Sequence, residues 1–324
     1  MAILITGGTG FIGQRLARKL GKSGKIILLA KHAPEGKKEG GKSIFDFSGT
    51  RIEYGDMKNK EDIDAIFRKN SIDMVYNLAA NLDESSPDMW DDNVLSARNI
   101  TEICARHGTR RIIHMSSCGV TGYGSISKED SPYNPNTAYE KSKAEAERII
   151  IASGLDYTII RAPIIIGPNS IWLKIARAAS KGYPIIGSGK NHLHLAYVDD
   201  VVDLLFLVRN RRSSWKEIFN VATRDMFTYE EVYAMLSSEL GAPAGRKHLP
   251  VFLVKIASSM NEILCRITGK KPGITLMKSS IERLVVNREV SIEKARDVLG
   301  FEPKYGTGRA LKETVSYFRE NKML

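Results

Sequence analysis

The apolar residues of this chain form short runs that alternate with stretches of helical periodicity. Buried strands are predicted at residues 2–5, 25–30, 51–54, about 73–80 and 111–115. Apolar residues at helical spacing predict helices after residue 13, around 63–67, and over 91–107 and 137–151. Strands and helices that alternate at this rhythm imply right-handed crossovers. The pattern therefore predicts an α/β fold with a Rossmann-type, doubly wound parallel sheet.

The second half of the chain departs from this rhythm. Pro163 and the pair at 167–168 mark an exit from the sheet, and helices are predicted over 171–181 and from Tyr197 onward. We expect a dinucleotide-binding domain at 1–165 with a return at about 191–222. A smaller C-terminal substrate-binding lobe would comprise 166–190 and 223–324.

Residues 249–269 of this lobe carry an apolar stripe at helical spacing. Its members are Leu253, Ile256, Met260, Ile263, Leu264 and Ile267. Packing into the core is the expected role of the stripe. The alternative is a helix lying in a membrane interface, against which Asn261 and Glu262 on its polar face argue.

Composition narrows the possible partners and compartment. Lys and Arg number 48 against 37 Asp and Glu, but these basic residues are scattered, which favours a solvated basic surface, then a phosphate-bearing ligand, over nucleic acid. Three distant cysteines indicate neither a disulfide framework nor a zinc site, and we expect no bound metal. No apolar run is long enough to span a bilayer. We expect a cytoplasmic protein that binds a small molecule.

A glycine cluster follows the first predicted strand. Gly7, Gly10 and Gly13 lie between that strand and the first helix. Glycine permits the backbone to turn sharply and approach a phosphate closely, and the helix then offers free N–H groups to the anion. A glycine trio alone is weak, but in this strand–turn–helix setting it predicts a dinucleotide site.

The residues after the second strand bear on the choice of dinucleotide. An acidic residue there would bind the ribose 2′-hydroxyl of NAD, whereas a cation accommodates the 2′-phosphate of NADP. The sequence continues with Lys31 and His32, has no acid before Glu35, and offers Arg15 on the first helix. NADP is therefore favoured over NAD, with solvated loop residues as the alternative reading of Lys31 and His32.

Candidate proton-transfer chemistry follows the fifth strand. That strand ends at Ser116 and Ser117, and strand ends form the ligand crevice of such sheets. Tyr139 and Lys143 are one helical turn apart on one face. A nearby ammonium would lower the pKa of Tyr139 from about 10 and make the phenol a general acid or base.

For two further pairs of polar residues the sequence gives weaker evidence of a functional role. Asp199 and Asp200 are expected to be first-turn acids favoured by the helix dipole rather than a catalytic pair. His192 and His194 alternate in a possible strand, where a substrate contact is conceivable.

Taken in order, these motifs resemble the extended short-chain dehydrogenase/reductase family. This group contains nucleotide-sugar epimerases and dehydratases, dihydroflavonol reductases and 3β-hydroxysteroid dehydrogenases. The matching stretches are TGGTGFIG at 6–13, GDM at 55–57, NLAA at 77–80, MSSCGV at 115–120, YEKSK at 139–143, RAPIIIGP at 161–168, HLAYVDDVV at 194–202, FNVA at 219–222 and LGFEP at 299–303.

The resemblance implies a mechanism and a set of site residues. Ser117 would bind the substrate oxygen, Tyr139 would exchange its proton, and Lys143 would hold the nicotinamide ribose. The implied cofactor-binding residues are Gly7, Gly10, Phe11, Ile12, Gly13, Lys31, Asp56, Met57, Leu78, Ala79, Ala80, Tyr139, Lys143, Pro163 and Ile166. The family also suggests a homodimer through the helices at 91–107 and 137–152.

One departure from the family pattern narrows the reaction. Sugar dehydratases of this group carry an Asp-Glu pair where this chain has Cys118 and Gly119. Cys118 is expected to be a buried packing residue, with an auxiliary acid as the alternative. We therefore expect hydride transfer between nicotinamide and a secondary alcohol or ketone carbon. The alternative is a nucleotide-sugar epimerase that retains NAD, with Arg283 and Arg288 as candidate diphosphate ligands or as solvated surface residues. A third possibility, a regulatory dinucleotide-binding protein with an idle site, is disfavoured by the intact Ser, Tyr and Lys.

Overall fold

The centre of the protein is a seven-stranded parallel sheet. The computed structural model describes residues 1–21, 24–31, 50–243, 247–268 and 278–324. The sheet runs in the order β12-β7-β5-β4-β1-β2-β3. Its strands are β1 (Ala2–Thr6), β2 (Lys25–Ala30), β3 (Thr50–Tyr54), β4 (Met74–Asn77), β5 (Arg111–Ser117), β7 (Asp156–Ala162) and β12 (Glu217–Asn220). The strand order reverses direction between β1 and β4, which is the position where such sheets bind ligands.

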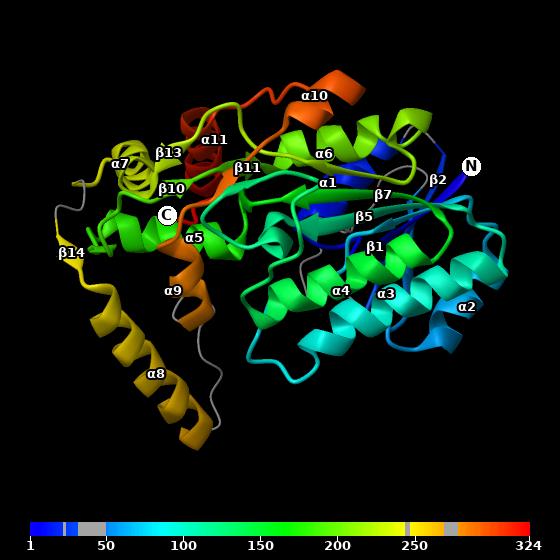
Figure 1. The fold of residues 1–324 in the computed structure, drawn as a ribbon, viewed down its shortest axis with the longest axis horizontal. Coiled ribbons are helices and arrows are strands. Elements are labelled where there is room, and N and C mark those ends of the chain that lie inside the picture. Colours follow the sequence, from blue (N-terminus) through cyan, green and yellow to red (C-terminus); the bar gives the residue numbers. More distant parts are fainter. Residues whose placement is uncertain (22–23, 32–49, 244–246, 269–277) are drawn as a thin grey trace.

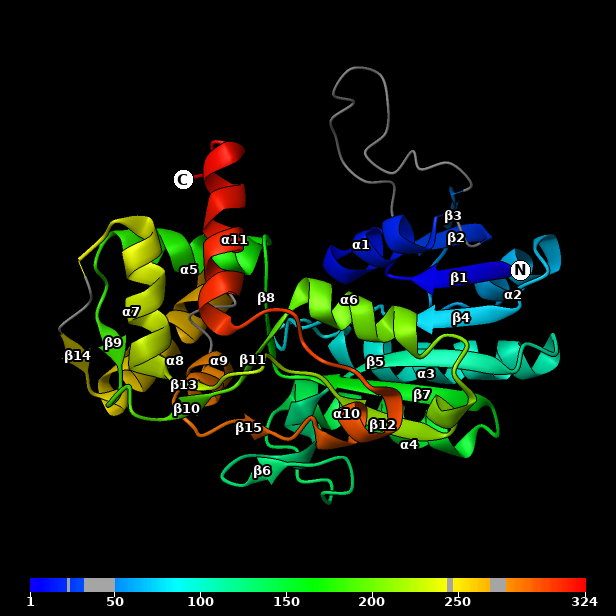
Figure 2. The same cartoon turned by 90° about the horizontal axis from the view of Figure 1, so that it is seen from above.

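Helices cover both faces of the sheet (Figures 1 and 2). One face packs against α2 (Lys60–Lys69), α3 (Met89–Arg106) and α4 (Ala138–Ala152). The other packs against α1 (Phe11–Leu20), α6 (Val198–Leu207) and α10 (Glu293–Leu299). Because both faces are covered, β1 is buried along its whole length, as is usual for strands of a parallel sheet.

A second lobe lies beside the carboxyl ends of the strands (Figure 2). Its core joins α5 (Ser170–Ser180), α7 (Tyr229–Leu240) and α11 (Thr307–Glu320). Among the described residues, four short strand pairs lie outside the central sheet: β8 (Ile164–Ile166) with β11 (Leu195–Tyr197), β10 (His192–Leu193) with β13 (Phe227–Thr228), β9 (Ile185–Ile186) with β14 (His248–Leu249), and β6 (Ile126–Ser127) with β15 (Glu289–Val290). Two further helices, α8 (Val251–Thr268) and α9 (Lys278–Leu284), extend from this lobe.

The predicted α/β fold and parallel sheet are confirmed. The predicted strand at 25–30 coincides with β2, and the predicted helices at 91–107 and 137–151 agree with α3 and α4 within two residues. β5 extends two residues past its apolar run at 111–115 and ends at Ser117, as expected, whereas β4 stops at Asn77 and leaves residues 78–80 as a loop. No helix among the described residues is long and apolar enough to cross a membrane.

The expected core packing is wrong for the described part of the stripe on α8, whereas the side chains of Ile263, Leu264 and Ile267 lie outside the described residues. Leu253, Ile256 and Met260 are 48%, 54% and 66% exposed. The helix projects away from the rest of the molecule beside α9 (Figure 1), so this face has no described part of the chain to pack on.

A buried ion pair fastens α4 to the sheet. Arg161 of β7 contacts Glu147 of α4 through two nitrogens, at 3.0 and 2.7 Å, and both side chains are essentially inaccessible. Tyr133 donates a further hydrogen bond to the same carboxylate at 2.8 Å. Because water cannot replace a lost partner at this depth, each charge depends on the other.

We predict that Glu147→Gln lowers the free energy of unfolding by about 3–5 kcal/mol, because it leaves the Arg161 charge buried without a counterion. Urea denaturation monitored by circular dichroism measures the loss. Glu145→Gln on the same helix is the matched control, since its pair with Arg148 is exposed and should contribute about 0–1 kcal/mol. Equal losses in the two variants would contradict the assignment.

Candidate active site

The glycine turn is packed against the loop that follows β4. Gly7 has φ of +63°, and a Cβ on it would lie 2.9 Å from both the Cα and the N of Ala79. A Cβ on Gly13 would overlap the Gly7 carbonyl oxygen. Thr6 Oγ1 accepts hydrogen bonds from the N–H groups of Leu78 and Ala79, each at 3.1 Å. Glycine is thus required here for close approach of two backbone segments.

The start of α1 suits a phosphate. Its N-cap, Gly10, makes no side-chain capping bond, and the first turn contains no acidic residue. The N–H groups of Phe11, Ile12 and Gly13 therefore face the turn with the positive end of the helix dipole. These N–H groups could hold the pyrophosphate of a dinucleotide, which is the role that the sequence predicts for them.

The predicted adenosine end of the site lies beside β2 and β3. Lys31, directly after β2, forms ion pairs with Asp56 at 3.0 Å and with Asp92 at 3.6 Å. Burial raises the pKa of Asp56, but the N–H of Lys58 and the charge of Lys31 outweigh it and hold the pKa below its ordinary value. Met57, the next residue, is buried. His32 and Glu35 lie outside the described residues.

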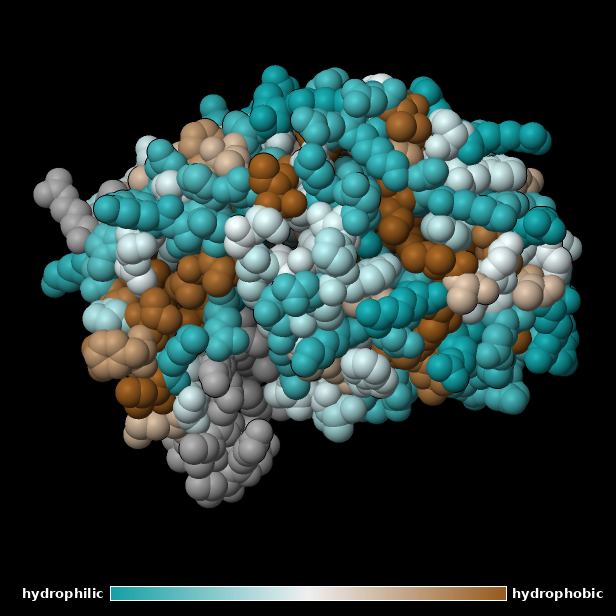
Figure 3. Space-filling view, viewed as in Figure 1, coloured by the Kyte–Doolittle hydropathy of each residue, from teal (hydrophilic) through white to brown (hydrophobic). Residues whose placement is uncertain are grey.

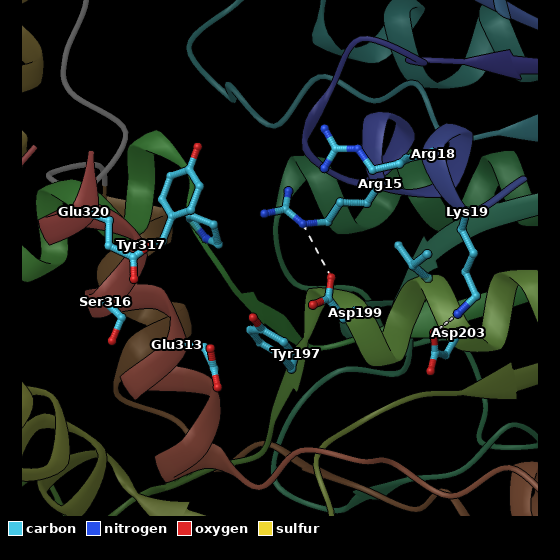
Figure 4. Close-up of a pocket in the computed structure, with 12 residues that line it drawn as sticks. Arg15, Arg18, Lys19, Tyr197, Asp199, Asp203, Glu313, Ser316, Tyr317 and Glu320 are labelled. Atoms are coloured by element: carbon cyan, nitrogen blue, oxygen red, sulfur yellow. Dashed lines mark hydrogen bonds and ion pairs between the residues drawn. The ribbon is translucent and has the colours of Figure 1, made fainter. Parts of the chain in front are cut away.

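Arg15 does not reach this region, contrary to the suggestion from sequence. Its Nε lies 3.5 Å from Asp199 of α6, and its Nη1 donates to the Phe11 carbonyl at 3.0 Å. Arg15 lines a cavity of about 510 Å³ between α1, α6 and α11 (Figure 4). Ser117, Tyr139 and Lys143 do not line this charged cavity, which is therefore separate from the candidate site.

A capping box sets the position of Tyr139. Thr137 is the N-cap of α4, and its hydroxyl accepts from the N–H of Glu140 while the Glu140 carboxylate accepts from the N–H of Thr137. Tyr139 therefore lies in the first turn of the helix. Its carbonyl accepts from Ser142 Oγ at 2.7 Å, and Asn93 of α3 donates to that hydroxyl.

The two serines at the end of β5 differ in exposure. Ser117 is half-buried, and its Oγ accepts from the N–H of Gly119 at 3.1 Å. Ser116 is buried, and its Oγ has no hydrogen-bond partner among the described residues. Ser117 is therefore the hydroxyl of this pair that is open to a ligand.

Lys143 is buried and turned toward β5. Its Nζ donates to the Met115 carbonyl at 2.6 Å and lies 3.3 Å from His114 Nε2. Burial lowers the pKa of Lys143 to about 8. Burial and Lys143 together also hold the pKa of His114 well below its ordinary value, which leaves the imidazole neutral.

The expectation that Lys143 lowers the pKa of Tyr139 is wrong for this structure. Burial raises the pKa of Tyr139 to about 12, and the cation that opposes this rise is Arg283. The Lys143 ammonium faces the strand carbonyl, so helical spacing alone did not bring its charge to the phenol.

Arg283, on α9 of the second lobe, reaches the candidate site. Its guanidinium lies 5.8 Å from the centre of the Tyr139 ring and pairs with Glu84 at 3.1 Å. Arg288 is buried, pairs with Glu140 at 3.3 Å and lies over the Tyr123 ring. Neither arginine is the solvated surface residue that the sequence left open.

The remaining candidates have structural partners. Asp199 and Asp200 lie in the first turn of α6, as expected. Asp200 is buried and also accepts from the N–H groups of Lys304 and Tyr305, which anchors a distant loop to the helix. His194 is held between the Thr223 carbonyl and the Val290 N–H. His192 pairs with Glu289 at 2.8 Å. Burial raises the pKa of Cys118 to about 12, as suits a packing residue.

Pro163 and Ile166 frame the same edge of the sheet. Pro163 separates β7 from β8, and Ile166 is the buried last residue of β8. Sequence reasoning missed Asn93, His114, Glu84 and the cap at Thr137. Only the cap had a signal in the sequence, namely Thr and Glu three residues apart.

Comparisons with known proteins identify the family of this chain. The model of the NAD dependent epimerase/dehydratase family matches residues 3–222. An N-acetyl-alpha-D-glucosaminyl-diphospho-ditrans,octacis-undecaprenol 4-epimerase of Escherichia coli O157:H7 is 25% identical over 97% of this chain and 94% of the relative. A decarboxylating sterol-4-alpha-carboxylate 3-dehydrogenase of Saccharomyces cerevisiae is 25% identical over 98% of each chain.

Solved structures share the fold. A dTDP-glucose 4,6-dehydratase of Bacillus anthracis in complex with NAD superposes with a TM-score of 0.78 at 23% identity, covering 99% of this chain and 97% of the other. The family match covers more than half of the chain and includes the glycine turn, Ser117, Tyr139 and Lys143. The protein is an enzyme of the NAD dependent epimerase/dehydratase family.

Proposed function

We propose that this enzyme transfers a hydride between NADP and a secondary alcohol or ketone carbon, with Tyr139 as the general acid or base. Ser117 hydrogen-bonds the substrate oxygen, and Lys143 holds the nicotinamide ribose. The nicotinamide, when bound, supplies or accepts the hydride. In the reductive direction the phenol of Tyr139 gives its proton to the oxygen; in the oxidative direction the phenolate takes it.

The observation that carries this proposal is where the three side chains lie. Ser117 ends β5, and Lys143 Nζ is hydrogen-bonded to Met115 on the same strand. Tyr139 is one turn from Lys143, at the start of α4. Because β1 and β5 are parallel, their carboxyl ends share the edge that bears the glycine turn. A single dinucleotide lying along this edge would contact both the glycine turn and the side chains of Ser117, Tyr139 and Lys143.

The geometry favours an oxidoreductase over the alternative, a nucleotide-sugar epimerase that retains NAD. The two arginines considered for a diphosphate, Arg283 and Arg288, already face Glu84 and Glu140. Dehydration is disfavoured further, since Gly119 has no side chain and the Cys118 thiol stays protonated. The state of the purified protein separates the candidates: exchangeable cofactor with steady NADPH consumption supports the reductase, and tightly held NAD without net turnover supports the epimerase.

The NADP preference rests on Lys31. The Lys31 side chain is 44% exposed and its partners Asp56 and Asp92 are half-buried, so a 2′-phosphate could recruit the ammonium from these partly exposed ion pairs. The proposal also keeps the division into a dinucleotide domain at 1–165 and a substrate lobe. We propose in addition that the protein is cytoplasmic and forms a homodimer through α3 and α4. Sedimentation velocity tests the dimer.

We predict that Tyr139→Phe lowers kcat/KM by about 10²–10⁴-fold, because it removes only the hydroxyl that exchanges the proton. Cofactor binding, measured by fluorescence titration, should stay within about twofold, since the ring remains. An unchanged kcat/KM in this variant would show that Tyr139 is not the general acid or base, whereas cofactor binding with no turnover in the wild type would support a dinucleotide-binding protein with an idle site.

We predict that Arg283→Gln displaces the pH profile of alcohol oxidation by about one pH unit to higher pH, since the cation lowers the pKa of Tyr139. Glu84→Gln should displace it to lower pH, because the Glu84 charge raises that pKa. The measurement is kcat/KM against pH.

Arg309→Gln is the matched control, since Arg309 stacks on Tyr305, away from Tyr139. A purely structural role for Arg283 and Glu84 would slow both variants without displacing their profiles in opposite directions.

We predict that Lys31→Ala reduces the ratio of kcat/KM for NADP to that for NAD by about tenfold, through the loss of a charge-assisted hydrogen bond. Lys25→Ala, at the opposite end of β2, removes the same charge and should leave the ratio unchanged. An unaltered ratio in Lys31→Ala would remove the basis for the NADP preference.

A further inference from the structure

The exposed stripe of α8 is a continuous apolar surface. Phe252, Leu253, Ile256 and Met260 are between 48% and 66% exposed and recur at i, i+1, i+4 and i+8. At 3.6 residues per turn these positions lie on one side of the helix. Figure 3 shows apolar residues gathered where α8 leaves the second lobe. Single exposed apolar residues are ordinary on protein surfaces, but a contiguous stripe indicates an interaction site.

A different side of α8 is already occupied. Lys255 pairs with Glu282 of α9 at 3.1 Å, and Ser258 is buried. The stripe is therefore the outer surface of an anchored helix, and Figure 1 shows α8 projecting from the edge of the molecule. Nothing in the described part of the chain lies over it.

The charge of this segment indicates what the stripe contacts. The charge of Lys255 is neutralised by its pair with Glu282. The rest of the sequence between residues 246 and 271 contains five basic residues and one acidic residue: Arg246, Lys247, Arg266, Lys270 and Lys271 against Glu262. Apolar residues flanked by excess positive charge favour an anionic lipid surface. Two copies of the same segment would bring like charges together, which argues against α8 as a self-association surface.

We propose that α8 docks the enzyme on an anionic membrane surface, with Phe252, Leu253, Ile256 and Met260 entering the interface. The helix lies in the plane of the interface rather than crossing it, in agreement with the lack of a spanning helix among the described residues. This inference does not depend on the proposed reaction. Its consequence for the site is that α9, which carries Arg283 beside Tyr139, lies next to the docked helix.

Vesicle flotation of the full-length protein tests the proposal. We expect the protein to bind vesicles containing about a third phosphatidylglycerol at least about tenfold more strongly than pure phosphatidylcholine vesicles at about 0.1 M salt. The double variant F252Q/I256Q should lose about tenfold or more of this binding. Glutamine keeps the helix propensity high, and circular dichroism confirms that the variant is folded.

The matched control is V298Q/Y317Q, which removes two apolar side chains of 40% and 45% exposure from α10 and α11. It should bind vesicles as the wild type does. Wild-type protein that does not float, or a F252Q/I256Q variant that floats equally well, would overturn the proposal. So would a change in sedimentation velocity of F252Q/I256Q in the absence of lipid, because it would show that a second copy covers the stripe.

Discussion

A buried series of hydrogen-bonding side chains ties the glycine turn to the helix of the candidate site. Thr6 Oγ1 donates to Asn77 Oδ1 at 2.8 Å, and Asn77 Nδ2 lies 3.1 Å from His114 Nδ1. His114 Nε2 in turn lies 3.3 Å from Lys143 Nζ. The four side chains are at most 3% exposed. Removing any one of them would therefore leave its neighbour with neither a protein partner nor water to hydrogen-bond. The series crosses β1, β4 and β5 and reaches α4, which fixes the phosphate-binding turn relative to Lys143.

This arrangement also explains the unequal electrostatics of the Tyr139–Lys143 pair. The Lys143 ammonium is committed to the Met115 carbonyl and to the end of the buried series. Burial is the main cause that raises the pKa of Tyr139, and the cation that opposes it is Arg283 of the second lobe, which pairs with Glu84. The protonation of Tyr139 therefore depends on how the second lobe sits over the sheet. A substrate bound between the lobes would therefore affect both the position of the second lobe and the protonation of Tyr139.

The sequence was sufficient for the features that depend on local pattern. Buried apolar runs located the strands, and parallel pairing brought Ser117 to the same edge as the glycine turn. What it could not supply were partners distant in the chain. Thr6 and Asn77 are 71 residues apart, and Arg283 reaches Tyr139 from another lobe. Spacing fixes which residues share a helix face, but the direction of a flexible side chain such as Arg15 or Lys143 depends on those distant partners.

The stripe on α8 is a second case in which the sequence does not identify the contact partner. Helical periodicity establishes that one face is apolar and must leave water, but it does not say what that face meets. On α1 the buried residues Leu16, Ala17 and Leu20 meet the sheet, since the chain crosses directly between β1 and β2. Helix α8 has no such connection, because it leaves the second lobe after β14 and is held on α9 by a polar contact. An apolar stripe that lies outside both cores binds an external surface, and the charge of the residues around it selects that surface. The residues around this stripe carry excess positive charge, which favours an anionic surface.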